Sequence, residues 1–455
     1  MKITIIGTGY VGLVTGVCIS EFGFDVTCVD HDESKIADLR NNICPIYEPS
    51  VEQMLRTNSS AQRLQFTTDI ASAASDADVI FIAVGTPSKE GGDEIDLSYL
   101  FGAVEDVCPH LKQGAVVIVK CTAIAGTASK VREKIAALRP DLDFSVVSNP
   151  EFLREGSAVD DFMKPDRVVI GAHDERGREV AEQIYRPLKL QSTPFRLTSL
   201  EDAELAKYAS NAFLALKVTF INEIADLCEK TGANVMEVAD IMGLDERIGD
   251  RFLRAGPGFG GSCFPKDSRA LMAFAKEAGA PQRLVETAID VNENRKLQMA
   301  KRILDALGKE PAGKTVSLLG VAFKPDTDDV REAPALSIIE TLTDAGVNVR
   351  AFDPQAKRDG EPALQKVVWC GDPYEAAENS DAVVIATEWN VLRALDLDRL
   401  RTAVSEPLMI DLRNVHRRKE PAKYGFKYIS IGRSVAEASF DASELDRPEL
   451  RVVSG

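Results

Sequence analysis

A single cysteine stands in the stretch GGSCFPKD, residues 260–267, between paired glycines and a Pro-Lys-Asp run. Ser262 and Pro265 predict the start of a helix that continues through SRALMAFAKEAG, with Ser262 as its N-cap. Cys263 then lies at the positive end of a helix and close in sequence to Lys266, and both features lower the pKa of a thiol. The pattern predicts a nucleophilic thiolate at Cys263.

The residues around this cysteine add to the prediction. Asp267 follows Cys263 by four residues, one helical turn later, so the two share a helix face. The preceding loop is rich in glycine, as expected where a substrate meets backbone amides closely, at Gly256, Gly258, Gly260 and Gly261. The alternative is a small buried hydrophobic residue, the role that we expect for the other seven of the eight cysteines.

Two more pairs of polar residues have a spacing of four. Lys207 and Asn211 lie on a predicted long helix and point the same way, and an ammonium beside an amide can hold a developing oxyanion. The spacing alone favours the other interpretation, an exposed lysine on a solvated helix face. Glu151 and Glu155, in SNPEFLREG, either form a charged helix face or, at a strand end, orient a water or bind a cofactor ribose.

The sequence GTGYVG lies between a predicted strand and an apolar helix, in residues Gly7, Gly9, Tyr10, Val11 and Gly12. Glycines permit a tight turn and close approach, and the helix N-terminus offers amides to a pyrophosphate, although an ordinary strand-helix turn is the alternative. The next predicted strand ends in Asp30, which can accept hydrogen bonds from ribose hydroxyls. We therefore predict NAD as the cofactor. Asp30 disfavours the extra phosphate of NADP, and the nearby Lys35 leaves that preference open.

Three other segments are candidate ligand contacts. Thr86 and Thr122 follow predicted strands of the same sheet, where ligands of open α/β sheets bind, or else they cap the following helices. Lys324 and Arg331, in AFKPDTDDVRE, follow the first strand of a second predicted sheet. They either neutralise phosphates or belong to a solvated charge cluster.

The spacing of histidines and cysteines limits the chemistry. The four histidines lie outside every motif, so proton transfer would fall to Asp267, a lysine, or a water held by Glu151. There is no CxxC pair and no Cys/His spacing typical of a metal site, so we expect no metal and a reducing compartment.

The elements that must position these residues are predicted by Val/Ile-rich runs that alternate with helical patterns, typical of parallel sheets with crossover helices. One long helix is predicted from Leu200 to Gly232. Strands are predicted at 3–6, 25–30, 78–84, 115–120 and 144–148, and again at 314–320, 347–354, 381–387 and 407–414. The predicted fold is α/β, with two Rossmann-like doubly wound domains joined by a long helix and a central helical domain. The predicted bounds are 1–198, 199–300 and 301–440, with a tail at 441–455.

The length of the chain predicts the number of domains, and its net charge excludes some classes of partner. A chain of 455 residues predicts about three domains. The net charge of -17, from 54 basic and 71 acidic side chains, repels nucleic acid and anionic membranes. No apolar stretch has membrane-spanning length, and the N-terminus reads as a strand and turn and not as a signal peptide. We expect a soluble, cytoplasmic protein with no nucleic-acid or membrane partner.

Taken together, GTGYVG, NPEFLREG, the Lys207/Asn211 helix, GPGFGGSCFPKD and FKPDTDDVRE occur in the order typical of nucleotide-sugar dehydrogenases. The chain resembles the UDP-glucose/GDP-mannose dehydrogenase family from residue 1 to about residue 435. The resemblance implies that NAD oxidises the C6 alcohol of UDP-glucose twice, through a thiohemiacetal and a thioester on Cys263. GDP-mannose and UDP-N-acetylmannosamine are alternative substrates. Two rivals are a non-catalytic NAD-binding scaffold and a two-electron dehydrogenase of the 2-hydroxyacid or 6-phosphogluconate type with a structural cysteine.

The resemblance also implies roles for individual residues and a homodimer formed through the long helix, whose apolar run is FLALKVTFI. The implied catalytic residues are Cys263, Lys207, Asn211, Asp267, Glu151 and Thr122, with Lys207 and Asn211 as oxyanion contacts and Asp267 orienting water. Beyond the GTGYVG turn, Asp30, Lys35 and Thr86, the implied cofactor contacts are Thr122, Glu155, Lys266 and Arg331. The implied UDP-sugar contacts are Glu151, Phe152, Leu153, Arg154, Lys207, Asn211, Phe252, Leu253, Arg254, Ala255, Gly256, Gly260 and Lys324.

Overall fold

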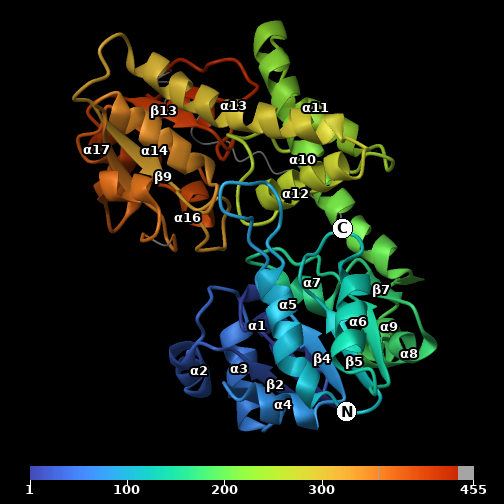
Figure 1. Ribbon diagram of the computed structural model, residues 1–455. Helices are drawn as coiled ribbons and strands as arrows, with labels where there is room; N and C mark the ends of the chain where they lie inside the picture. Colours follow the sequence, from blue (N-terminus) through green and yellow to red (C-terminus); the bar gives the residue numbers. More distant parts are fainter. Residues whose placement is uncertain (357, 439–455) are drawn as a thin grey trace. The chain divides into compact units, whose positions relative to one another are not determined.

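The computed structural model describes residues 1–356 and 358–438, and the chain divides into two compact units (Figure 1). The first unit comprises Met1–Ala212 and Lys266–Arg283. The second comprises Phe213–Pro265 and the described residues from Leu284 onward. The tail predicted at 441–455 lies outside the described residues.

The first unit is built on an eight-stranded sheet in the order β3-β2-β1-β4-β5-β6-β7-β8. Neighbouring strands are parallel except for β6 and β7. The strands are β1 (Lys2–Ile6), β2 (Asp25–Val29), β3 (Leu64–Thr67), β4 (Val79–Ile82), β5 (Ala115–Val119), β6 (Phe144–Ser148), β7 (Val168–Ala172) and β8 (Phe195–Thr198). The five strands predicted here are confirmed, and the first six positions have the doubly wound order.

Both faces of this sheet are covered by helices (Figure 1). One apolar cluster joins the sheet to α1 (Tyr10–Glu21), α2 (Glu33–Arg40), α3 (Val51–Ser60), α7 (Ala158–Met163) and α8 (Glu175–Ile184). A second joins the other face to α4 (Ile70–Asp76), α5 (Ser98–Val107) and α6 (Thr127–Leu138). Ile5 belongs to the first cluster and Ile6 to the second, because successive strand residues point to opposite faces. Burial on both faces explains the nearly continuous apolar strands.

The second unit has a six-stranded parallel sheet in the order β11-β10-β9-β12-β13-β14. The strands are β9 (Thr315–Leu319), β10 (Asn348–Phe352), β11 (Val368–Trp369), β12 (Ala382–Ile385), β13 (Leu408–Asp411) and β14 (Lys427–Ser430). Its helices include α11 (Val235–Gly243), α13 (Arg283–Leu307), α14 (Pro334–Asp344), α15 (Pro373–Ala377), α16 (Asn390–Arg393), α17 (Leu397–Ala403) and α18 (Glu420–Lys423). The four strands predicted in this half are confirmed, so both doubly wound sheets are present.

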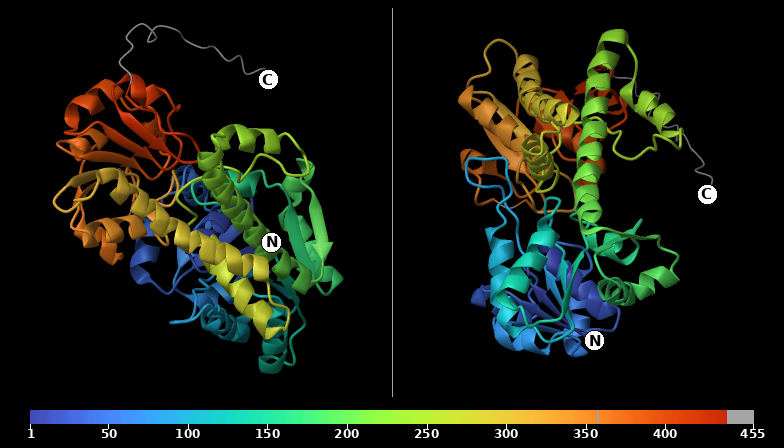
Figure 2. Two further views of the ribbon diagram at one scale, coloured as in Figure 1. Left: turned by 90° about the horizontal axis from the view of Figure 1, so that it is seen from above. Right: turned by 45° about the vertical axis from the view of Figure 1, so that its right-hand side comes forward.

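The predicted long helix is α10 (Leu200–Thr231), 32 residues without interruption (Figure 2). Gly232 follows it with a φ of +77°, the left-handed conformation that glycine adopts most readily at a helix end. Within the described residues, no helix combines the length and apolar character needed to cross a bilayer.

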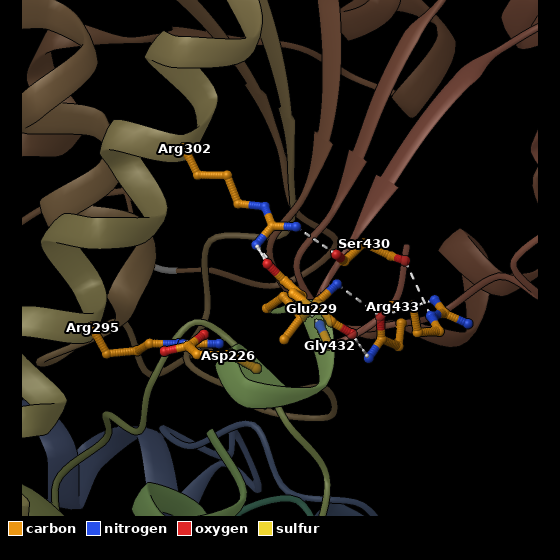
Figure 3. A network of polar contacts seen from close by, with 10 residues as sticks. Asp226, Glu229, Arg295, Arg302, Ser430, Gly432 and Arg433 are labelled. Atoms are coloured by element: carbon orange, nitrogen blue, oxygen red, sulfur yellow. Dashed lines mark hydrogen bonds and ion pairs between the residues drawn. The ribbon is translucent and has the colours of Figure 1, made fainter. Parts of the chain in front are cut away.

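Arg302 of α13 forms an ion pair with α10 and a hydrogen bond with the end of β14 in the second unit (Figure 3). The Arg302 guanidinium donates to the Glu229 carboxylate at 2.8 Å and to the Ser430 carbonyl oxygen at 2.7 Å. Arg295 forms an ion pair with Asp226, which lies three residues before Glu229 on α10. Arg295 also donates to the Gly256 carbonyl oxygen, so α13 holds the loop between α11 and α12 (Phe264–Glu277).

Candidate functional site

The GTGYVG turn joins β1 to α1, as predicted. A side chain at Gly7, where φ is +97°, would place its Cβ 2.7 Å from the Ala83 carbonyl oxygen. At Gly12 a Cβ would lie 2.0 Å from the Gly7 carbonyl oxygen, whereas at Gly9 it would meet no protein atom within 4 Å. The fold therefore requires Gly7 and Gly12, and Gly9 keeps the approach to the helix N-terminus open. This geometry fits a pyrophosphate.

Asp30 directly follows β2 and is buried. Its carboxylate accepts hydrogen bonds from the Thr8 amide at 2.9 Å, the Thr8 hydroxyl at 2.6 Å and the Lys35 ammonium at 3.2 Å. Burial alone would raise the pKa of Asp30, but the hydrogen bonds from Thr8 and its neighbours outweigh burial and lower the pKa to about 2. A fixed anion therefore stands beside the turn, and Lys35 is paired with it.

The two threonines lie where strands of this sheet end. Thr86 is buried after β4 and Thr122 is half-buried after β5. The residues that cap the following helices α5 and α6 are Leu97 and Gly126. The interpretation of these threonines as helix caps is therefore wrong, and cofactor contact stays a prediction for both.

Lys207 and Glu151 form an ion pair inside the first unit. The Lys207 ammonium donates to a Glu151 carboxylate oxygen at 2.9 Å, and the two side chains are 3% and 5% exposed. Burial alone would raise the pKa of Glu151, but the charge and hydrogen bond of Lys207, the Leu153 amide and the charge of Lys120 together outweigh burial and lower the pKa. The interpretation of Lys207 as an exposed surface lysine is wrong. The segment from Glu151 to Glu155 is not helical, so a charged helix face is wrong as well.

One helical turn along α10, Asn211 engages a second buried carboxylate. Its amide donates to Asp267 at 2.7 Å, and the Lys266 ammonium donates to the other oxygen of Asp267, also at 2.7 Å. Asp267 is 1% exposed and lies in the first turn of α12. The structure thus brings four of the predicted catalytic residues together in the first unit as two pairs, each with one partner on α10.

A buried lysine near Glu151 was not predicted. Lys120 directly follows β5, and its ammonium lies 3.0 Å from the Asn149 amide oxygen and 3.4 Å from the Tyr185 hydroxyl. Burial lowers the pKa of Lys120 to about 8, against the opposing charge of Glu151. Lys120 and Glu151 line the same cavity of about 40 Å³. The available signal was a lysine placed directly after five apolar strand residues.

The segment after Glu151 is fixed by further contacts. The Leu153 amide donates to Glu151 at 2.6 Å, and the Arg167 guanidinium lies 3.8 Å from the centre of the Phe152 ring. Arg154 forms an ion pair at 2.6 Å with an aspartate that lies at the start of the next helix. Three predicted substrate contacts therefore belong to one ordered segment of the first unit.

Cys263 belongs to the second unit and is half-buried directly before α12. The helix begins at Phe264, so the residue next to its first turn is Cys263 and not Ser262, which corrects the predicted N-cap by one position. The Ser262 hydroxyl lies 3.6 Å from the Cys263 sulfur. The thiol therefore has the predicted place at the N-terminus of a 14-residue helix.

The glycines before Cys263 are needed by the protein's own packing. A Cβ at Gly260 would lie 2.3 Å from the Glu332 carbonyl oxygen, and the Gly261 amide donates to the Arg331 carbonyl oxygen at 2.8 Å. This loop thus packs on the segment that carries Lys324 and Arg331, so the structure brings two predicted motifs together. The chain itself makes the close approach at these glycines, and contact with a substrate stays a prediction.

Arg331 and Lys324 are placed differently within that segment. The Arg331 guanidinium makes two hydrogen bonds of 2.8 Å to Asp329, and its side chain is 61% exposed. The Lys324 ammonium lies 5.8 Å from the centre of the Phe323 ring. Phosphate neutralisation by these cations stays a prediction.

Three polar side chains that the sequence did not point to hold the loop between α11 and α12. Asn222 accepts from the Gly256 amide at 2.8 Å, and Arg295 donates to the Gly256 carbonyl oxygen at 3.2 Å. Asn292 accepts from the Phe259 amide at 2.8 Å and donates to the Phe259 carbonyl oxygen at 3.1 Å. The signal for Asn292 and Arg295 was their helical spacing on α13, whereas Asn222 lies on α10.

The predicted UDP-sugar segment from Phe252 to Gly256 alternates in exposure. Leu253 and Ala255 are buried, whereas Arg254 is exposed. Phe252 has a positive φ of 65°, and its ring centre lies 5.8 Å from that of Phe264. The segment thus has a defined conformation in the second unit.

Comparison with known proteins identifies the family. Three family models match in chain order: the NAD binding domain of the UDP-glucose/GDP-mannose dehydrogenase family over residues 1–189, its central domain over 201–294 and its UDP binding domain over 317–418. The chain belongs to the UDP-glucose/GDP-mannose dehydrogenase family. Its NAD-binding domain contains the GTGYVG turn and Asp30, and its UDP-binding domain contains Lys324 and Arg331.

Individual members of the UDP-glucose/GDP-mannose dehydrogenase family match along almost their whole length. The UDP-glucose 6-dehydrogenase of Rhizobium meliloti (strain 1021) is 51% identical over 435 residues, which cover 95% of this chain and 100% of the relative. A UDP-glucose dehydrogenase structure from Pyrobaculum islandicum has a TM-score of 0.85 at 36% identity and covers 94% of this chain and 96% of its own. The structure of a UDP-D-ManNAc dehydrogenase from Pyrococcus horikoshii has a TM-score of 0.84 at 28% identity, covering 95% and 99%.

Proposed function

We propose that this protein oxidises UDP-glucose to UDP-glucuronate, consuming two NAD and one water for each sugar. The observation that carries the chemistry is the pair of buried contacts on α10, Lys207 with Glu151 and Asn211 with Asp267. Such charges are costly to bury and are typical of a reaction centre. For the substrate, 51% identity to a UDP-glucose 6-dehydrogenase outweighs 28% to a UDP-D-ManNAc dehydrogenase.

In the proposed reaction, Cys263 retains the half-oxidised sugar. Bound NAD accepts one hydride in each of the two oxidations. Loss of the first hydride and a proton converts the C6 alcohol to an aldehyde. The Cys263 thiolate adds to the aldehyde carbon and the oxygen takes up a proton, which gives a thiohemiacetal. Loss of the second hydride from C6 and of the hydroxyl proton gives a thioester, and hydrolysis of the thioester by water releases the carboxylate and restores the thiol. Covalent retention prevents the aldehyde from diffusing away or reacting with lysines.

The residues of the first unit have proton-handling and charge-stabilising roles in this proposal. Lys207 and Asn211 stabilise the oxygen of C6 as negative charge develops on it. Asp267 and Glu151 orient the attacking water and take up its proton. Thr122 lies beside the cofactor. A purely structural role for these side chains would not explain why two carboxylates, an ammonium and an amide are buried together.

We propose the same ligand contacts and domain bounds that the sequence predicts. The GTGYVG turn, Asp30, Lys35, Thr86, Glu155, Lys266 and Arg331 contact NAD, while residues 151–154 and 252–256, with Gly260 and Lys324, contact the UDP-sugar. We assign residues 1–198 to cofactor binding, 199–300 to a central helical domain and 301–440 to UDP-sugar binding.

We further propose a homodimer that forms through α10. Phe213, Phe220 and Leu227 are 62%, 49% and 57% exposed, and their seven-residue spacing places them on one side of the helix. A second copy of this surface would bury them. Sedimentation of Phe220→Glu should give a smaller species than the wild type, and an unchanged dimer would remove this surface from the proposal. A reducing, cytoplasmic location fits the eight cysteines, all of which lie in the described residues as thiols without a disulfide.

The decisive experiment counts NADH against sugar consumed. UDP-glucose should yield two NADH per sugar, whereas a two-electron dehydrogenase yields one and a scaffold yields none. Turnover with GDP-mannose or UDP-N-acetylmannosamine but not with UDP-glucose would overturn the substrate. Cys263→Ser should bind NAD and UDP-glucose normally and lose net turnover, and an undiminished rate in that variant would overturn the covalent route.

A further inference from the structure

Glu48 connects two distant segments of the NAD-binding domain. It lies in the loop before α3, outside every motif that marked the cofactor site, and is 7% exposed. One carboxylate oxygen accepts from the Ala158 amide at 2.7 Å. The other accepts from the Gly156 amide at 2.6 Å and from the Tyr10 hydroxyl. Both oxygens of this buried carboxylate thus accept hydrogen bonds from donors in other parts of the chain.

The two segments that meet at Glu48 both carry candidate cofactor contacts. Tyr10 belongs to the GTGYVG turn, and Gly156 directly follows Glu155. The Gly156 amide also lies 3.1 Å from the Tyr10 hydroxyl, so Tyr10, Glu48 and Gly156 contact one another in a closed triangle. The turn after β6 is thereby fixed to the turn after β1.

The charges around this triangle make Glu48 the acceptor and Tyr10 the donor. Burial, the hydrogen bond to Glu48 and the charges of Glu48 and Glu155 raise the pKa of Tyr10 far above its usual range, so its hydroxyl keeps its proton. A buried carboxylate without partners is strongly unfavourable, and hydrogen bonds to a carboxylate are stronger than those between neutral groups. Gly156 has a φ of +76°, and the bond from its amide to Glu48 holds that turn conformation.

We propose that Glu48 is a positioning residue for NAD: it fixes the GTGYVG turn and the Glu155–Gly156 turn relative to each other, so that both present preformed contacts to the cofactor. Glu48 acts through Tyr10 and Gly156 and takes no part in the chemical steps. The inference rests on NAD binding at the GTGYVG turn and not on the identity of the sugar substrate.

The test uses the full-length protein with Glu48→Gln, Tyr10→Phe and the double variant, and with Glu52→Gln as the control. Glu52 is a glutamate of the adjoining helix α3, and its pairing with Arg56 is exposed to solvent. Titration with NAD alone should show affinity weakened about tenfold in Glu48→Gln, as expected for the loss of one charge-assisted hydrogen bond. Tyr10→Phe should lose less NAD affinity than Glu48→Gln, and Glu52→Gln should bind NAD as tightly as the wild type.

Steady-state kinetics separate positioning from a general structural role. In Glu48→Gln the KM for NAD should rise while the KM for UDP-glucose and the kcat at saturating NAD stay within about twofold of wild type. The combined loss of NAD affinity in the double variant should be smaller than the two single losses added together, because either change removes the Tyr10–Glu48 contact. NAD affinity that is unchanged in both single variants, or an equal rise in both KM values, would overturn the proposal.

Two further outcomes are also decisive. If Glu48→Gln does not fold, Tyr10→Phe decides, because it removes only one hydroxyl, and wild-type NAD affinity in that variant overturns the proposal. If the wild type binds NAD but does not oxidise UDP-glucose, the proposed substrate fails while the NAD titration still tests Glu48.

Discussion

The buried pair of Lys207 and Glu151 leads to a stability prediction that the structure makes quantitative. The Lys207 Nζ and Glu151 Oε1 atoms lie 2.9 Å apart, and both side chains are almost fully buried. Removing one partner of a buried pair costs about 3–5 kcal/mol of unfolding free energy, because an uncompensated charge remains. For Lys207→Met we expect about 3 kcal/mol, since the Leu153 amide and Lys120 still favour the Glu151 carboxylate.

A double-mutant cycle isolates the interaction. Lys207→Met, Glu151→Gln and the double variant are compared by urea unfolding at pH 7, with Lys230→Met at an exposed position of the same helix as the control. The double variant should lose less unfolding free energy than the two single variants together, giving a coupling energy of about 2 kcal/mol. The unfolding free energy of the control should stay within about 0.5 kcal/mol of wild type. Coupling below about 0.5 kcal/mol would refute the reasoning.

The pH dependence gives a second measurement of the same pair. The pKa of Glu151 is lower in the folded protein than its ordinary value of 4.5. The pair therefore stabilises the fold above about pH 4.5, and this contribution is lost as the pH falls through the folded pKa. The stability difference between wild type and Lys207→Met should be largest near neutral pH and should shrink in acid. A constant difference from pH 7 to pH 3 would contradict the assignment.

Three further predictions concern other parts of the site. Gly9→Ala should keep the wild-type Tm but weaken NAD binding in a titration, whereas Gly12→Ala should lower the Tm, because its Cβ would lie 2.0 Å from a carbonyl oxygen. Burial lowers the pKa of Lys120 to about 8 from an ordinary 10.5, so between these pH values the unfolded chain binds more protons than the folded protein. From pH 7 to pH 10, the unfolding free energy of the wild type should therefore rise by about 2–3 kcal/mol relative to Lys120→Met, as measured by urea unfolding. Asn292→Ala leaves both backbone groups of Phe259 without their partner, so the KM for UDP-glucose should rise more than the KM for NAD in initial-rate assays.

The fold was largely predictable because its signals are local. Nine predicted strands are confirmed, since strands buried on both faces stand out as apolar runs between helical patterns. The edge strands β3, β8 and β11 were missed because they are short and partly exposed, so their sequences mix polar and apolar residues. The fully buried β7 was also missed, although its sequence VVIGA carried an apolar signal. The edge strand β14 was missed as well, because it is short and begins with an exposed lysine.

The sequence by itself determined the residues whose chemistry depends on their immediate neighbours. The left-handed conformation of Gly7, the close approach of Gly12 to Gly7 and the position of Cys263 before α12 follow from backbone geometry within a few residues. The tertiary structure alone decided that Lys207 is buried against Glu151, 56 residues away, and that Glu48 reaches Gly156, 108 residues away. Spacing along a helix shows which residues share a face, but only packing shows whether that face meets water or a carboxylate.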